Sequence, residues 1–176
     1  SSEENVKKIL GALATSKRPR ALESYNCTVR FNGVSLSTLT HFARHRMKSI
    51  GIPSLTLTNR RRHILPNTIA EKPDLKERYC KAFEKTADLY DELRASGISE
   101  ELCAYIQLSG NTVDIVTTIN GRELLLFMKL RSCTRAQWEI RDLLKEMKSL
   151  VPSELHVMLV PKCKSCTLIC NSPCNK

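Results

Sequence analysis

The 176-residue chain has few aromatic residues and no long apolar run. No stretch reaches 18 consecutive apolar residues, and the N-terminus lacks the apolar core of a signal peptide, so the sequence predicts no membrane span. Aromatic residues make up only 5% of the chain. Without them or a known nucleic-acid motif, the composition allows a nucleic-acid partner but does not favour one. We therefore expect a cytoplasmic protein that does not contact membranes.

The remaining composition is that of an ordinary globular protein, with 41% hydrophobic and 26% charged residues. Its length fits one domain with a substantial core. The formal net charge of +10 attracts anions such as nucleotides, nucleic acid, flavin pyrophosphate or acidic lipid heads. The densest basic cluster, Arg60-Arg61-Arg62-His63, is interpreted either as a solvated loop or as part of an anion site.

Periodicity and turn residues predict an α+β fold, in which an antiparallel sheet packs against several helices. A cleanly alternating strand over 25–31 is the clearest strand signal, and the turn pair Asn32-Gly33 is expected to end it. The expected elements are a helix over 4–14, this strand, a helix beginning after Ser35 or Ser37 and ending with 44–46, a strand over 54–58, a helix over 72–96, a helix over 99–108, and strands over 113–118 and 155–160.

Two further helices are expected to meet at a polar joint late in the chain. Asn120 can cap the first helix, with Glu123 three residues on, and Thr134 can cap the second, with Gln137 completing a capping box. Arg131 then falls just ahead of a helix N-terminus, where amide groups, the helix dipole and a guanidinium suit a phosphate. The alternative is that Arg131 only covers the joint by packing and hydrogen bonding.

A second basic group, Arg44-His45-Arg46, falls on the expected last turn of a helix. Cations there complement the helix dipole, which is a sufficient structural explanation. Two arginines and a histidine on one turn also repel each other, so an anion shared among them is the competing interpretation.

Four of the eight cysteines crowd into the last fourteen residues: Cys163, Cys166, Cys170 and Cys174. They supply enough thiolates for one zinc ion or an iron–sulfur cluster. Their spacing is neither the usual ferredoxin run nor two separated CxxC pairs, so two disulfides or a reduced tail are equally open. The other four, Cys27, Cys80, Cys103 and Cys133, stand among apolar neighbours as small buried hydrophobes.

Two stretches resemble the signatures of the flavin-dependent thymidylate synthases. One is TTINGRELLLFMKLRSCTRAQWEIR, which runs from Thr117 to Arg141; the other is Arg44-His45-Arg46-Met47-Lys48-Ser49, followed by Ser54. A weaker match is Ala21-Leu22-Glu23, where the family has a Glu-His pair. The resemblance spans roughly Leu22 to Leu150, with both signatures in the expected order.

The resemblance implies a homotetramer that binds FAD and deoxyuridine monophosphate (dUMP) in sites shared between subunits. Such an enzyme passes a hydride from reduced flavin to the pyrimidine and takes the methylene from methylenetetrahydrofolate, with NADPH as reductant, to form dTMP. It implies flavin binding by Arg44, His45, Arg46 and Asn120, with the first three also near the substrate. It further implies a catalytic and substrate-binding role for Ser54 and Arg131.

Several positions depart from the family pattern. Thr56 stands in place of an arginine, Ile52 in place of an acidic or amide residue, Leu126 in place of a flavin-facing polar residue and Ser24 in place of a histidine. The family's arginine before a Leu-Pro pair has no equivalent in the segment 103–108. Hydrogen bonds to charged groups contribute roughly 1.5–3 kcal/mol each, so two missing arginines would weaken substrate affinity on the order of a hundredfold or more. The hypothesis is a retained fold with doubtful synthase activity; the alternative is an inactive module that binds a nucleotide, nucleic acid or a partner.

The sequence suggests a synthase-like domain over 1–160 followed by a cysteine-rich tail over 161–176. The chain begins Ser1-Ser2, without methionine, and reaches Glu23 after fewer residues than the family usually has. We expect an N-terminally short, processed or truncated chain, or half of a fusion in which a second homologous domain supplies the missing residues.

Overall fold

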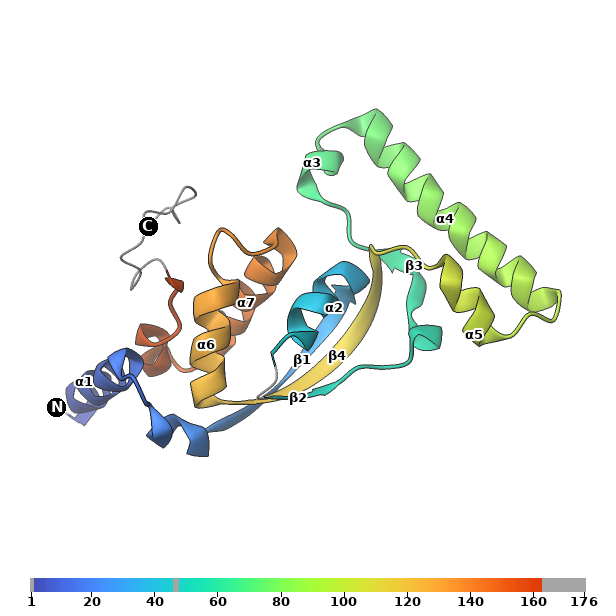
Figure 1. The fold of residues 1–176 in the computed structure, drawn as a ribbon. Coiled ribbons are helices and arrows are strands. Elements are labelled where there is room, and N and C mark those ends of the chain that lie inside the picture. The colour runs from blue at the N-terminus through green and yellow to red at the C-terminus, as the bar shows by residue number, and fades with distance from the viewer. Residues whose placement is uncertain (1, 46–47, 163–176) are drawn as a thin grey trace. The chain divides into compact units, whose positions relative to one another are not determined.

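The computed structural model describes residues 2–45 and 48–162 and has the expected α+β architecture (Figure 1). The helices are α1 Ser2–Thr15, α2 Leu36–Ala43, α3 Asn67–Ala70, α4 Pro73–Ala95, α5 Glu100–Cys103, α6 Gly121–Arg131 and α7 Trp138–Leu150. The strands are β1 Asn26–Ser35, β2 Lys48–Gly51, β3 Asn59–His63 and β4 Asn111–Asn120. Short 3-10 helices are η1 Arg20–Ser24, η2 Leu55–Leu57, η3 Ala104–Ile106 and η4 Ser153–Val157.

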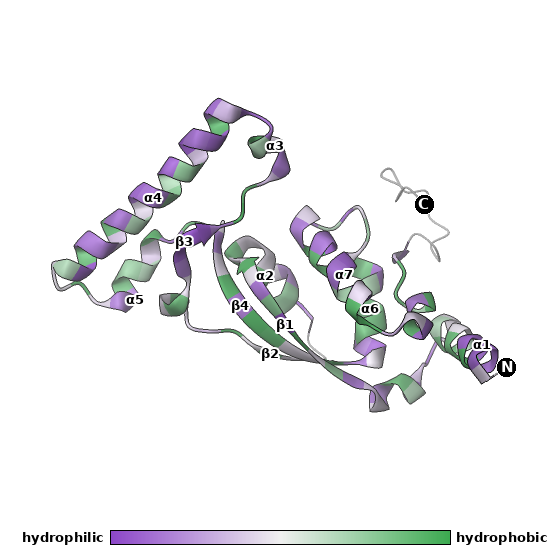
Figure 2. Ribbon diagram, turned by 180° about the vertical axis from the view of Figure 1, so that it is seen from behind, coloured by the Kyte–Doolittle hydropathy of each residue, from purple (hydrophilic) through white to green (hydrophobic). Residues whose placement is uncertain are grey.

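The four strands form one sheet in the order β1-β4-β2, and β3 pairs antiparallel with β4. Strand β4 lies between β1 and β2 in the sheet. Its β-branched residues Val113, Ile115 and Ile119 are buried at alternate positions, as expected for a central strand. Figure 2 shows β4 as largely apolar and α4 as largely polar. The predicted strand over 113–118 is confirmed and is longer than expected.

The chain divides into two compact units. The first comprises the described parts of 1–29, 44–49 and 117–176, and the second comprises 30–43 and 50–116. Strands β1 and β4 each start in one unit and end in the other. None of the helices in the described part of the chain is long and apolar enough to span a bilayer.

The core of the first unit lies between α6 and α7. Buried residues of α6 (Leu124, Leu125, Phe127 and Met128) and of α7 (Ile140, Leu144 and Met147) supply it. On its other side Leu22, Leu125 and Met158 form a cluster against which α1 packs. A Cβ on Gly121 would lie 2.8 Å from the Leu22 carbonyl oxygen, so glycine is what lets η1 approach α6 this closely.

In the second unit, the basic cluster of residues 60–63 is a strand, β3, and not a loop. The Arg60 guanidinium lies 3.4 Å from the ring centroid of Tyr90 on α4, a cation–π contact. Arg61 forms ion pairs with Asp88 and Asp91 of the same helix. Two of the three arginines of this cluster therefore contact α4 and link it to β3.

Strand β1 continues through the pair Asn32-Gly33, so the turn predicted there is wrong. Gly33 adopts a φ of 71°, a conformation that favours glycine, and its N–H donates to Asp114 Oδ1 at 2.8 Å. Arg30 donates to the other carboxylate oxygen at 2.9 Å. These two bonds, Arg30 first, lower the pKa of Asp114. A cross-strand carboxylate thus replaces the turn that the local sequence suggested.

Other expected boundaries also shift. The strand expected over 54–58 is the 3-10 helix η2, capped by Ser54, and the strand expected over 155–160 is replaced by η4. The helix expected over 99–108 is split into α5 and η3. Helix α2 ends at Ala43, so Arg44 and His45 follow the helix and do not form its last turn. Arg46 lies outside the described residues. Of the four cysteines expected to be buried, Cys103 is, while Cys27, Cys80 and Cys133 are partly exposed.

A substitution in the α6–α7 core tests this packing. Leu144→Ala removes a fully buried side chain and is expected to lower the free energy of unfolding by about 2–5 kcal/mol. Leu150→Ala, on the same helix, removes a side chain that is 80% exposed and is expected to change it by less than about 0.5 kcal/mol. Urea denaturation of both variants checks this; equal midpoints would contradict the described core.

Candidate functional site

The first turn of α6 is fixed by Asn120, as the sequence predicted. Its side-chain Oδ1 accepts a hydrogen bond from the backbone N–H of Glu123 at 2.9 Å. The N–H of Gly121 donates to the Tyr25 carbonyl at 2.7 Å. Two of the amide groups left unpaired at a helix start are therefore satisfied, and the end of β4 leads directly into α6.

The start of α7 differs from the prediction. Gln137, and not Thr134, is the N-cap: its Oε1 accepts from the Ile140 N–H at 3.0 Å, and the helix begins at Trp138. Arg131 is consequently the last residue of α6 and does not stand directly ahead of a helix N-terminus. The segment from Ser132 to Gln137 separates Arg131 from the first turn of α7.

Arg131 instead belongs to a hydrogen-bonded chain of three side chains in the first unit. Its Nε donates to Nε2 of His45 at 3.0 Å. The other ring nitrogen of His45, Nδ1, lies 2.9 Å from Oε1 of Glu123. The structure thus brings together His45 and Arg131, two residues that the sequence assigned to different signatures.

The chain is shielded from water. His45 is 8% exposed and Glu123 is 7% exposed. The ring of His45 stands edge-on to that of Phe127, with 4.6 Å between centroids. Burial, and secondly the positive charge of Arg44, lower the pKa of Arg131. The guanidinium still carries its charge at neutral pH, because its ordinary pKa is so high.

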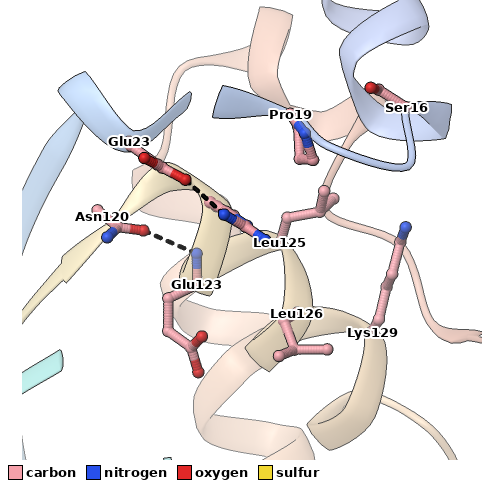
Figure 3. Close-up of a pocket in the computed structure, with 9 residues that line it drawn as sticks. Ser16, Pro19, Glu23, Asn120, Glu123, Leu125, Leu126 and Lys129 are labelled. Carbon is pink, nitrogen blue, oxygen red and sulfur yellow. Dashed lines mark hydrogen bonds and ion pairs between the residues drawn. The ribbon is translucent and has the colours of Figure 1, made fainter. Parts of the chain in front are cut away.

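A cavity of about 600 Å³ lies beside α6 in the same unit (Figure 3). Its lining combines the linker before η1, the end of β4 and one side of α6: Ser16, Pro19, Glu23, Asn120, Arg122, Glu123, Leu125, Leu126 and Lys129. Arg122 and Glu23 form an ion pair in its wall, and Lys129 Nζ donates to the Ala14 carbonyl at 3.2 Å. The volume is within the range of small-molecule and cofactor sites.

Comparisons with known proteins identify the family of this chain. The family model described as "Thymidylate synthase complementing protein" matches residues 1–155. This chain belongs to that family. The resemblance inferred from the sequence is thereby confirmed.

Similar proteins of this family include two from archaea, both named flavin-dependent thymidylate synthase. The Thermococcus onnurineus protein is 32% identical over 132 residues, covering 72% of this chain and 54% of its own length. The Saccharolobus solfataricus protein is 34% identical over 131 residues, covering 67% and 50%. This chain thus spans about half the length of these relatives.

Solved structures share the fold at lower identity. Thymidylate synthase X from Helicobacter pylori, crystallised with FAD and dUMP, has a TM-score of 0.65 at 22% identity and covers 87% of this chain and 82% of its own. The UMP/dUMP methylase PolB from Streptomyces cacaoi has a TM-score of 0.71 at 18% identity, covering 87% and 80%. At these identities the likeness establishes the family fold.

The remaining predicted site residues are distributed as follows. Asn120 lines the cavity, Arg44 is exposed, and Ser54 lies in the second unit, where its Oγ accepts from the Thr56 hydroxyl at 3.0 Å. Arg46 and the four tail cysteines (Cys163, Cys166, Cys170 and Cys174) lie outside the described residues. Their roles stay predictions.

Sequence reasoning missed Glu123 as a site residue. The capping-box pattern assigned its side chain to the helix start, whereas its carboxylate reaches His45, 78 residues away in the chain. Its local signal was a carboxylate that follows Arg122 and directly precedes the apolar run of α6. Of the wall residues, Arg122 lies within the second signature, whereas Lys129 gave no signal beyond its helical spacing.

Proposed function

We propose that this chain binds FAD and dUMP and takes part in the flavin-dependent methylation of dUMP to dTMP. The observation that carries this proposal is the placement of both assigned residues of the second signature on α6. Asn120 lies at the start of the helix, on a cofactor-sized cavity, and Arg131 lies at its end, held by His45. The names of the related proteins supply the reaction class.

The cavity has the mixed chemistry that a flavin requires. Leu125 and Leu126 give an apolar wall for a planar ring system, and Asn120 and Lys129 give polar and cationic groups for its carbonyl and phosphate oxygens. These residues would hold FAD, which supplies hydride transfer when bound. The protein contributes the orientation of the flavin and the positive charge near its phosphates.

Filling the cavity is expected to abolish flavin retention. Leu126→Trp places an indole where the cofactor would lie, and the dissociation constant for FAD is expected to rise at least about tenfold. Leu130→Trp is the matched control, because Leu130 lies on the same helix with similar exposure (39% against 45%) but outside this cavity. The visible flavin spectrum after gel filtration gives the answer, and equal retention by both variants would refute the assignment of this cavity.

Arg131 is the proposed anchor for the nucleotide phosphate. A guanidinium carries its N–H donors in a planar fork whose geometry matches a phosphate, and the bond from Arg131 Nε to His45 orients that fork. The surroundings that bury it also strengthen its attraction for an anion.

Arg131→Ala is expected to weaken dUMP binding by about 10- to 150-fold, which corresponds to about 1.5–3 kcal/mol for a hydrogen-bonded charge. Arg135→Ala removes an exposed arginine from the joint between α6 and α7 and is expected to change the affinity little. Calorimetric titration with dUMP measures both; an unchanged affinity of the Arg131 variant would remove it from the site.

The departures from the family pattern predict slow catalysis by this chain alone. Thr56, Ile52 and Leu126 replace groups that, by the resemblance, contact the substrate or the flavin. Turnover of dUMP by the purified chain, with FAD, NADPH and methylenetetrahydrofolate, is expected to be slow even though the chain binds FAD and dUMP. Steady-state turnover at a rate typical of enzymes, roughly 1 s⁻¹ or more, would contradict this expectation.

The proposal includes association with further copies of this chain, or with a second homologous domain, to complete the site. The second unit supports it, since Leu55, Leu57, Leu102 and Tyr105 are each more than half exposed on η2, α5 and η3. A monomeric mass in light scattering at micromolar concentration would argue against self-association.

A further inference from the structure

The three-residue chain joins both ends of α6 through a residue from elsewhere in the sequence. Glu123 lies in the first turn of the helix and Arg131 is its last residue. His45, from the segment after α2, contacts both of them at hydrogen-bond distance. All three belong to the first unit. The orientation of Arg131 is therefore coupled to a residue two helical turns away from it.

The donor and acceptor roles in this chain follow from the chemistry of arginine. The Nε of a guanidinium always carries a hydrogen, so His45 Nε2 must be the acceptor of the bond from Arg131. A neutral imidazole has one N–H, which then lies on Nδ1 and points to the Glu123 carboxylate. His45 is neutral in this arrangement, between a cation and an anion.

Glu123 is what selects this tautomer. A buried carboxylate accepts strongly from Nδ1–H, so it stabilises the form in which Nε2 is free of hydrogen. Without the carboxylate, the imidazole can place its hydrogen on Nε2. Two donors, Nε2–H and the Arg131 Nε–H, would then face each other at 3.0 Å, and the guanidinium would have to move.

We propose that Glu123 is a positioning residue, which orients the Arg131 guanidinium for an anionic substrate by fixing the tautomer of His45. The inference rests on the proposed function of Arg131 and adds a residue to that site. The helix start does not depend on the Glu123 side chain, because Asn120 bonds to its backbone N–H. A side-chain substitution at this position therefore leaves the cap of α6 in place.

Glu123→Ala and Glu123→Gln separate positioning from simple stabilisation. The alanine variant removes the acceptor and is expected to raise the dissociation constant for dUMP by about 10- to 100-fold, the usual effect of losing a group that orients a ligand-binding residue. The glutamine variant keeps an oxygen that can accept from Nδ1–H and is expected to stay within a few-fold of the wild type. Leu144→Ala serves as the control for lost stability alone.

Nitrogen-15 NMR of the full chain with labelled histidine supplies a readout that needs no ligand. The wild type, the glutamine variant and the Leu144 variant are expected to show His45 as the Nδ1–H tautomer, and the alanine variant is expected to lose that signature. An Nε2–H tautomer in the wild type, or an unchanged His45 signal in the alanine variant, would overturn the inference.

The two proposals fail in different ways. If Arg131→Ala leaves dUMP affinity unchanged, the nucleotide anchor is wrong, and the positioning of a substrate by Glu123 falls with it. If Arg131→Ala weakens binding while Glu123→Ala does not, the anchor stands and the positioning role is overturned. If Glu123→Gln weakens binding as much as Glu123→Ala, the charge of the carboxylate acts directly and the tautomer is not the cause.

Discussion

The buried chain from Glu123 through His45 to Arg131 is the interaction on which the rest of the site depends. It requires a carboxylate and a guanidinium to be held at fixed separation, and one rigid helix does this more reliably than two loops. Helix α6 is rigid because its start is capped by Asn120 and its apolar residues are locked against α7. The eleven residues of α6 thus contribute both to the core of the first unit and to the geometry of the site.

The electrostatics of the molecule follow from how its positive charges are distributed. A net charge of +10 suggests a generally basic surface. In the densest basic cluster, however, Arg61 is paired with Asp88 and Asp91, and Arg60 lies over the ring of Tyr90. Near α6 the cations are used differently. Arg122 is paired with Glu23, and Arg131 donates to His45 and lies near Arg44. The proposed anchor for an anion is therefore a guanidinium held by a histidine that itself contacts a buried carboxylate.

Local sequence determined well those elements whose signals lie within a few residues. The Asn120 cap, the alternating strand β1 and the long helix α4 are of this kind, since each depends on backbone capping or on periodicity. The failures involve partners distant in the chain. Gly33 was taken for a turn because its bond to Asp114, 81 residues away, has no local signature. Thr134 was predicted as the cap of α7 because glutamine is not among the usual N-cap residues, whereas in the structure the Gln137 side chain accepts from the Ile140 N–H.

The difference between exposed and buried positions explains how the family fold can be kept while residues of the site differ from the family pattern. Three of the residues that depart from the family pattern lie at the surface: Ile52 is 40% exposed, Leu126 is 45% exposed, and Ser24 is exposed as well. Substitutions there remove ligand contacts at little cost to the core, because surface changes usually alter stability by no more than about 0.5 kcal/mol. Glu123 and His45 are in the opposite situation. Each is buried and is the other's partner, so losing either one leaves an unsatisfied polar group in the core. A change at either residue is therefore expected to affect stability as well as the site. Arg131, the residue that they hold, is the part of the site expected to bind an anion even where turnover is slow.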